Sequence, residues 1–305
     1  MNELHVGRGT THGAMTVFPL WAATSGYRRY TMGGRDVEVT EADGNPDVGT
    51  LMVGNVGDRP ALVLAGQLFE GGWQHRMATG SVMIGVHQRI AVEVACVEQG
   101  RWAGTARQHS RGRRATPYVR DSVRHGGDVQ TEVWNRVAVH TQDVGVPSPG
   151  NRLSMSDLHW LRTTAPEGNP TGSFVHRLDQ ARAEREAWST LRPLPGQVGV
   201  LVGIGGHPYS AEVFDSPYRL RVQLPALLEA AALDARLAPP VATPSRRARR
   251  FLDRLDHIRL ERREPAGIAE RQRGSSEYAD VSLLRWQDHD VHATITNVRH
   301  PMLVA

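Results

Sequence analysis

Short apolar runs rich in β-branched residues fill the first hundred residues, and this pattern most limits what the chain can fold into. The runs are MTVFPLWA, VEVTE, TLMVGNV, ALVLAG, SVMIGV and IAVEVACVE. Gly, Asp, Asn and Pro separate them, which favours strands joined by tight turns. Residues 61–65 are continuously apolar, which predicts a strand buried on both faces. The sequence therefore predicts a β-sheet layer from Met15 to about Glu98.

Helical periodicity is clearer in the second half of the chain. Apolar residues recur at helical spacing in RLDQARAEREAWSTL and in SPYRLRVQLPALLEAAALDARL, where Ser216-Pro217 is typical of a helix start. A further helix is expected from Thr243 to Ile258, and strands are expected in VGVLVGIGG, ADVSLLRW and DVHATITNV. We therefore predict an α+β or mixed α/β fold. A β-rich half (1–145) would pack against a helix-rich α/β half (146–305) in one compact unit.

The composition bounds the location and the partners. The chain has 305 residues, of which 40% are hydrophobic and 22% charged, so it can bury a sizeable core. No apolar run approaches the roughly 20 residues of a membrane span, and the N-terminus lacks the apolar region of a signal peptide. A cytoplasmic location without a membrane partner is expected. The sequence indicates neither a cofactor nor an oligomeric state.

The basic residues are all arginine, since the sequence contains no lysine. This usage is typical of a GC-rich genome; the alternative is selection for bidentate recognition of phosphate or carboxylate. The formal charge is only +4 because 32 acidic residues nearly balance the 36 arginines. Aromatic residues are sparse at 6%, so a nucleic-acid partner is not favoured. The basic segment 101–124 and the arginine-rich helix 243–258 keep phosphate-backbone binding as an alternative.

The densest polar cluster lies on GQLFEGGWQHR and, one strand later, on ACVEQGRW. Buried strands flank both segments, so their ends would bring the polar side chains together. The side chains are those of Gln67, Glu70, Gln74, His75, Arg76, Glu98, Gln99, Arg101 and Trp102. A guanidinium can bind phosphate or carboxylate in a bidentate manner, and an indole can stack on a base or a sugar. The cluster therefore suits a flat or phosphorylated small molecule.

Each residue of the cluster has an expected role. Arg76 and Arg101 would hold phosphate, and Trp102 or Trp73 would stack. Gln74 and Gln99 would add hydrogen bonds to the ligand. Glu98 and His75 would share acid–base work, because an imidazole titrates near neutral pH. The alternative is that Arg76, Glu98 and Arg101 form a structural ion-pair network at a loop junction.

Three other features are weaker candidates. Cys96, the single cysteine, excludes an intrachain disulfide and a multi-cysteine zinc site. It ends an apolar strand, where small buried cysteines are common, so a nucleophilic role is not favoured. VGIGGHP (202–208) lacks the spacing and the lysine of a phosphate loop and indicates a tight turn. QDHDVH (287–292) could bind a divalent metal, but a solvated hairpin turn is favoured, and no metal ligand is predicted.

The motif pattern resembles that of a known family. The residues that carry it are Leu62, Leu64, Gly66, Gly71, Gln74, Arg76, Cys96, Val97, Glu98, Gln99, Gly100, Arg101 and Trp102. They resemble the ARPP family, whose members are associated with ADP-ribosylglycohydrolases and with rhodanese-phosphatase-superfamily proteins. QVGVLVGIGG…AEVFDSP…LPALLEAAALDA resembles its second motif block. The chain departs from the family pattern at His75, where Asn is frequent, and at Glu212, where Asp is frequent.

The resemblance implies a context of ADP-ribose, NAD or nucleotide metabolism and supplies no mechanism. Three functions stay open. The chain could be an enzyme acting on an ADP-ribose-like or other phosphorylated nucleoside. It could be a non-catalytic module that binds or senses the same ligand. It could also be a basic nucleic-acid-binding protein, whose affinity would fall steeply with salt.

Overall fold

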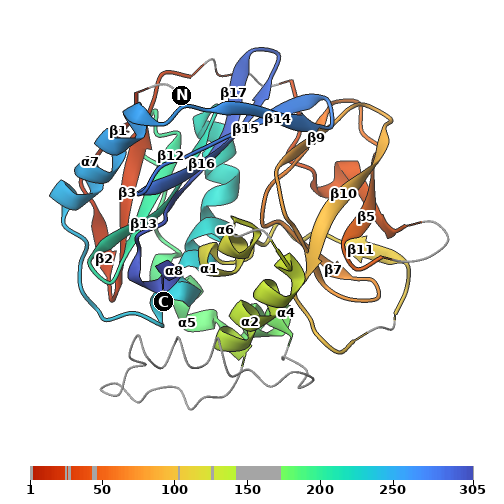
Figure 1. Cartoon of the computed structure of the whole chain (residues 1–305), viewed down its shortest axis with the longest axis horizontal. Coiled ribbons are helices and arrows are strands. Elements are labelled where there is room, and N and C mark those ends of the chain that lie inside the picture. Colours follow the sequence, from red (N-terminus) through yellow and green to blue (C-terminus); the bar gives the residue numbers. More distant parts are fainter. Residues whose placement is uncertain are drawn as a thin grey trace. The chain divides into compact units, whose positions relative to one another are not determined.

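A computed structural model describes residues 3–24, 26, 29–42, 47–101, 104–124, 127–141 and 173–304 (Figure 1). The chain forms two compact units. Unit 1 combines Met1–Arg28 with Ala183–Val304, and unit 2 is formed by Arg29–Arg182. The boundary expected between residues 145 and 146 lies outside the described residues.

Unit 1 is built on a nine-stranded antiparallel sheet. Its strand order is β1-β3-β12-β13-β17-β16-β15-β14, and β2 pairs with β3. The strands are β1 (His5–Val6), β2 (Thr10–His12), β3 (Met15–Trp21), β12 (Gly199–Ile204), β13 (His207–Phe214), β14 (Glu261–Ala266), β15 (Ala269–Ser275), β16 (Ala279–Trp286) and β17 (His289–Asn297). The N-terminal strands thus share one sheet with strands from the last third of the chain.

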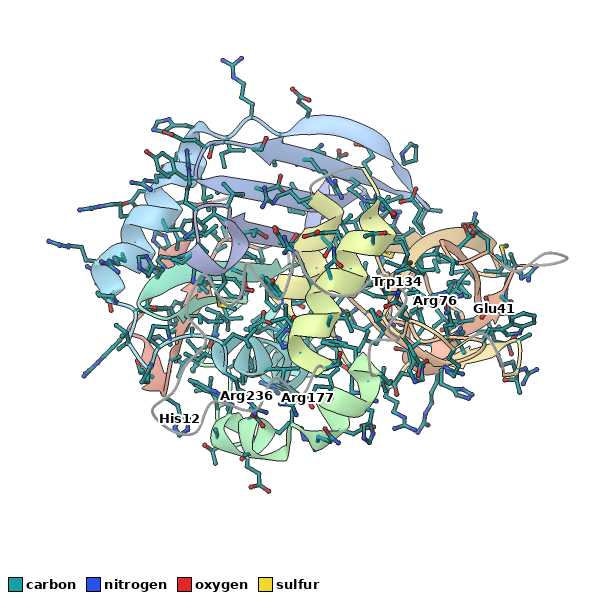
Figure 2. All side chains as sticks on the ribbon, turned by 60° about the horizontal axis from the view of Figure 1, so that its bottom comes forward. His12, Glu41, Arg76, Trp134, Arg177 and Arg236 are labelled. Atoms are coloured by element: carbon teal, nitrogen blue, oxygen red, sulfur yellow. The ribbon has the colours of Figure 1, made fainter. Side chains whose placement is uncertain are left out.

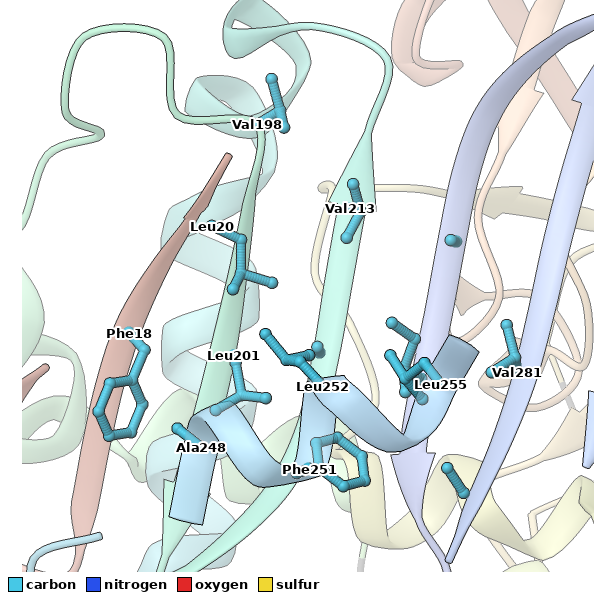
Figure 3. Close-up of a cluster of buried hydrophobic side chains, with 14 of the residues drawn as sticks. Phe18, Leu20, Val198, Leu201, Val213, Ala248, Phe251, Leu252, Leu255 and Val281 are labelled. Carbon is cyan, nitrogen blue, oxygen red and sulfur yellow. The ribbon is translucent and has the colours of Figure 1, made fainter. Parts of the chain in front are cut away.

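Two longer helices pack on this sheet. The helices of unit 1 are α5 (Arg182–Trp188), α6 (Pro217–Ala235), α7 (Ser245–Asp253), the 3-10 helix η3 (Arg254–His257) and α8 (Pro301–Val304). Helix α7 places its apolar face on alternate residues of β3, β12, β13, β16 and β17 (Figure 3). Helix α6 begins at the expected N-cap Ser216 and contacts β3, β12 and β13. No helix in the described part of the chain is long and apolar enough to cross a membrane.

Unit 2 contains a closed six-stranded barrel in the order β10-β5-β4-β11-β7-β8. Its strands are β4 (Val37–Glu41), β5 (Thr50–Asn55), β7 (Leu68–Gly71), β8 (Arg76–Ala78), β10 (Arg89–Cys96) and β11 (Arg107–His109), with β6 (Ala61–Val63) and β9 (Val82–Ile84) forming a separate pair. The helices are η1 (Gly34–Asp36), α1 (Pro117–Arg120), η2 (Asp121–Arg124), α2 (Val129–Thr141) and α4 (Phe174–Gln180). All the strands expected before Glu98 are confirmed.

The predicted α+β or mixed α/β fold with a helix-rich second half is wrong. The described residues contain 17 strands and only short or medium helices, and β12–β17 all follow residue 146. Strands β14 and β15 were missed because their sequences, ERREPA and AERQRGS, are charged; β15 has no fully buried face that would produce apolar alternation. Strand β13 was also missed, because it buries polar residues such as Ser210 and Glu212.

His300, just before α8, is held in unit 1 as a neutral side chain. It is 2% exposed; its Nε2 donates to the Ile204 carbonyl at 3.0 Å, and its Nδ1 accepts from the Met302 amide at 3.2 Å. The ring lies 4.5 Å from that of Tyr209. Burial is the main reason that the pKa of His300 falls to about 4. Protonation of this ring therefore opposes folding.

We predict that unit 1 loses stability as the pH falls from about 6.5 towards 4. In this window the unfolded chain binds a proton that the folded ring excludes, and the loss from this one group is roughly 3 kcal/mol. Urea unfolding between pH 4 and pH 7.5 measures it. His300→Asn should flatten the curve in this window, whereas replacement of the exposed His257 should not. Equal pH dependence in all three proteins would contradict the assignment.

Candidate functional site

The structure brings most of the predicted site residues together on unit 2. The segment GQLFEGGWQHR forms β7, a turn and β8, which are strands that the sequence did not predict. Cys96 on β10 pairs with Arg76 on β8, and Gln108 on β11 pairs with Gly71 on β7. The cluster therefore follows directly from closure of the barrel.

Arg76 lies inside the barrel with a set of polar partners. Its Nη1 donates to Gln74 Oε1 at 2.8 Å, and its Nη2 lies 3.8 Å from Glu41 Oε2. Gln108 Nε2 donates to Glu41 Oε1 and to the Gln74 carbonyl, each at 3.1 Å. Figure 2 shows the labelled Arg76 and Glu41 in the barrel. We call Glu41, Gln74, Arg76 and Gln108 the interior network.

The interior network is closed to solvent. The side chains of Arg76 and Glu41 are 0% and 3% exposed. Burial lowers the pKa of Arg76, although Cys96 and Glu41 oppose the shift; an arginine nevertheless stays charged in proteins. In this structure the Arg76 guanidinium faces protein groups. Its expected contact with phosphate stays a prediction, and the geometry gives it a positioning role.

The turn between β7 and β8 requires glycine. Gly72 has a φ of 57°, and a Cβ at this position would overlap the side-chain amide of Gln108. The Gly72 amide donates to the Arg107 carbonyl at 3.0 Å, and the Trp73 amide donates to Glu41 Oε1 at 3.2 Å. The turn is therefore tied both to β11 and to the interior network.

His75, Glu98 and Arg101 meet at the outer edge of this turn. Glu98 Oε2 accepts from Arg101 Nε at 2.7 Å and from the His75 amide at 3.2 Å. Arg101 also donates to the carbonyls of Gly72 (3.0 Å) and Gly71 (3.2 Å). The side chains are 18%, 13% and 33% exposed for His75, Glu98 and Arg101. We call these three residues and the Gly71–Gly72 turn the barrel rim.

The protonation states at the barrel rim limit its chemistry. Burial acts to raise the pKa of Glu98, but the Arg101 hydrogen bond and His75 lower it on balance. Burial lowers the pKa of His75 against the opposing charge of Glu98. His75 Nδ1 accepts from the Gly71 amide at 2.9 Å, so Nε2 carries the proton, 3.7 Å from Glu98 Oε2. His75 is thus a donor, and Glu98 is an ionised, weakly basic acceptor.

Cys96 has the environment of a structural cysteine. It is fully buried, and burial raises the pKa of its thiol despite the Glu98 amide and Arg76. Its backbone amide and carbonyl each bond the side chain of Gln130 on α2 at 2.8 Å. A raised pKa suppresses the thiolate, which is the nucleophilic form, so the geometry does not favour catalysis by Cys96.

Two exposed side chains, an arginine and a histidine, extend the barrel rim along β11. Because Gln108 points into the barrel, Arg107 and His109 point outwards, and both are exposed. A Cβ added at Gly71 would lie 3.7 Å from His109 Cδ2, so this imidazole adjoins the same turn as His75. In the part of the chain that the structure describes, the Arg107 guanidinium has no ion pair or hydrogen bond. The outer surface here is positively charged.

The segment 101–124 is attached to the barrel. Its described residues include β11, the short helix α1 and the 3-10 helix η2. Arg113 binds both oxygens of Glu70 on β7, at 3.0 and 2.6 Å, and Arg124 binds Asp121 at 2.7 Å. The first ion pair ties the segment to the barrel, and the second lies within the segment.

The remaining predicted residues have different positions. Gln74 belongs to the interior network, and its Nε2 also contacts the Glu98 carbonyl at 3.4 Å. Gln99 is half-buried in the turn after β10 and makes no hydrogen bond among the described residues. Trp102 lies outside the described residues. Its expected stacking role stays a prediction, and Trp73 is the indole that the structure places at the turn.

Sequence reasoning missed a buried acid–histidine pair in unit 1. His292 Nε2 lies 2.9 Å from Glu212 Oε2, both residues are buried, and the His292 ring is 4.9 Å from that of Phe214. Glu212 pairs with Thr294, two residues from His292, so both side chains lie on one face of the sheet. Correct pairing of β13 with β17 would have revealed this contact.

The QDHDVH segment forms the β16–β17 hairpin, as favoured from the sequence. Trp286 pairs with His289, and Gln287 and Asp288 both have positive φ, which is typical of a tight hairpin turn. Among the residues that the structure describes, no group of three or more His, Cys, Asp or Glu side chains could hold a metal ion. VGIGGHP likewise turns between β12 and β13 at Gly205 and Gly206.

The chain is thus an antiparallel β protein of two units, and one unit contains a barrel with a buried, ion-paired arginine. The family model described as ARPP-1, the ARG and Rhodanese-Phosphatase-superfamily-associated Protein domain, matches residues 3–296. The chain belongs to this family, and the resemblance inferred from the motifs is confirmed. No curated protein and no solved structure matches the chain.

We predict that Arg76 and Glu41 are strongly coupled. Arg76→Met should lower the free energy of unfolding by about 3–5 kcal/mol, because it leaves a buried carboxylate without its counter-charge. Glu41→Gln should cost a similar amount, and the double variant should cost less than the sum. Urea unfolding of the four proteins measures the coupling. As a control, Arg59→Met at the exposed Arg59–Asp58 pair should lower the free energy of unfolding by less than about 1 kcal/mol. Additive losses for Arg76→Met and Glu41→Gln would contradict the coupling.

Proposed function

We propose that unit 2 binds a small phosphorylated nucleoside of the ADP-ribose type at the barrel rim, without turning it over. One observation carries this proposal. The exposed residues Arg107 and His109 lie on β11 beside the glycine turn that also bonds His75 and Arg101. An anionic group and a hydrogen-bonding sugar could therefore be bound side by side.

The family description supports the class of ligand. It associates the domain with ARG, the ADP-ribosylglycohydrolases, whose chemistry concerns ADP-ribose. ADP-ribose combines phosphates, ribose hydroxyls and a flat base. These groups match the guanidinium, carboxylate, imidazole and indole side chains that surround the turn.

The geometry assigns each group a binding role. Arg107 would bind a phosphate oxygen, because its guanidinium has no partner in the described part of the chain. Glu98 would accept from a ribose hydroxyl, and His75 Nε2 would donate to a second oxygen. Arg101 and the interior network would hold these groups in place, since Arg101 already bonds Glu98 and two backbone carbonyls. A preorganised site binds with less loss of side-chain entropy.

The same geometry favours binding over catalysis. A general base needs a pKa near the working pH, whereas the pKa of Glu98 is lowered. His75 can accept a second proton only by giving up its bond from the Gly71 amide. Neither of the two residues expected to share acid–base work is therefore poised to move a proton.

We predict that ADP-ribose stabilises the protein in a thermal-shift titration and that Arg107→Ala weakens binding tenfold or more. Loss of one charge-assisted hydrogen bond accounts for an effect of this size, about 1.5–3 kcal/mol. Arg59→Ala removes an exposed arginine elsewhere on unit 2 and should leave affinity unchanged. Adenosine, which lacks phosphate, should bind the wild type and Arg107→Ala alike.

The enzyme alternative gives a different result in the same experiment. Chromatography of ADP-ribose and NAD after long incubation should show no product with the wild type. If product forms with the wild type and does not form with Glu98→Gln, the protein is an enzyme and the binding-module proposal is wrong. Absence of any thermal shift from a folded protein, or full affinity in Arg107→Ala, would refute binding at the barrel rim.

A further inference from the structure

Four arginines cover the outward face of α7 in unit 1. Arg246, Arg247, Arg249 and Arg250 are all exposed, within the helix segment SRRARRFLD. The opposite face of the helix is fixed, because Ala248, Phe251 and Leu252 are buried in the core against the sheet (Figure 3). Nitrogen-tipped side chains project outwards from this helix in Figure 2. We call these four residues the α7 arginine patch.

Within the described part of the chain, the α7 arginine patch has no carboxylate partner. Arg247 donates to the Gly206 carbonyl at 2.6 Å. Arg246, Arg249 and Arg250 make no ion pair or hydrogen bond with any residue that the structure describes. Several arginines of unit 2 differ, since Arg113 and Arg136, for example, bind two carboxylates each. Three arginines without a carboxylate partner among the described residues therefore lie together on one helix face.

The position of the patch is unfavourable in the free protein. Arg246 and Arg250 are one helical turn apart, so their like charges repel each other. The first turn of α7 contains no acidic residue, although the helix dipole favours negative charge at that end. The only acidic residue within the helix is Asp253, at its end. A bound polyanion would relieve both effects.

We propose that the α7 arginine patch binds the phosphate backbone of a nucleic-acid duplex, independently of the barrel rim. Arginine binds phosphate oxygens in a bidentate manner. The helical rise of about 5.4 Å per turn spaces Arg246 and Arg250 on the scale of successive phosphates. The aromatic and aliphatic side chains Phe251 and Leu252 of α7 are buried, and the exposed Val241 beside Arg247 is the one apolar side chain established next to the patch among the described residues. Nucleic acid therefore fits this surface better than an acidic protein.

The structure changes the inference drawn from composition. Averaged over the chain, the charges of 32 acidic residues nearly cancel those of 36 arginines. This near-zero balance is why the composition did not favour a nucleic-acid partner. In the structure, carboxylates such as Glu70, Asp121 and Glu132 are engaged by the arginines of unit 2. The average charge therefore understates the local charge of α7.

The test compares the wild type with Arg246→Gln/Arg249→Gln/Arg250→Gln. Fluorescence anisotropy would measure binding to DNA and RNA duplexes of about two helical turns over a range of salt concentrations. For the wild type, log affinity should fall with log salt, and the triple variant should reduce that slope by about 3, one unit for each lost phosphate contact. Arg35→Gln/Arg59→Gln/Arg221→Gln removes the same charge from scattered exposed positions and should change the slope by less than one unit.

Several outcomes would overturn the proposal. They are no duplex binding at low salt, equal slopes for the two triple variants, or equally tight binding to polyglutamate, which would point to an acidic protein partner.

Circular dichroism and thermal unfolding check that the α7 variant folds. We expect a melting temperature at or above that of the wild type, because the substitution removes repulsion and glutamine is a good helix former. Because the barrel rim is unchanged in this variant, loss of duplex binding with retained ADP-ribose binding separates the two proposals.

Discussion

The charge of Arg76 inside the barrel is the constraint on which the rest of unit 2 depends. An arginine cannot shed its proton in a protein, so a buried one needs a fixed carboxylate and further acceptors. Glu41 on β4 supplies the carboxylate, and Gln74 in the β7–β8 turn supplies an acceptor. Gln108 on β11 then binds Glu41 and Gln74. Three strands and one turn are thereby set in place around a single guanidinium.

This constraint reaches the barrel rim through the β7–β8 turn. The turn bonds Glu41 through the Trp73 amide and Arg101 through the Gly71 and Gly72 carbonyls. Glu98 is oriented by Arg101 and by the His75 amide, so its carboxylate is fixed before any ligand arrives. A preorganised acceptor of this kind suits recognition, whereas its low proton affinity does not suit proton transfer. The structural network that the sequence left open is therefore present in the structure, and a ligand site at the barrel rim stays a proposal that this network would support.

The sequence predicted those parts of the fold that have an apolar pattern. The strands containing Val92 or Val200 were found because apolar runs mark them, and Ser216-Pro217 marked the start of α6. Strands β7 and β8 were missed because they are only four and three residues long and each contains a charged residue, Glu70 or Arg76. Residue types identified several side chains that lie together in unit 2 but could not reveal that Arg76 points inwards. That direction is decided by pairing with Cys96 when the barrel closes.

A chain without lysine must use arginine both where a guanidinium has a special advantage and where any cation would serve. The contacts that each arginine makes distinguish these two uses. Arg136 is fully buried, binds Glu132 and Asp121 and lies over the Tyr118 ring, which are contacts that a compact ammonium could not reproduce together. Arg246, Arg249 and Arg250 on α7 make no such contacts with the residues that the structure describes, and both the neighbouring like charges and the helix dipole are unfavourable to them. Arginine content as such is therefore uninformative here, and the presence or absence of an internal carboxylate is what distinguishes a structural arginine from one that faces a partner.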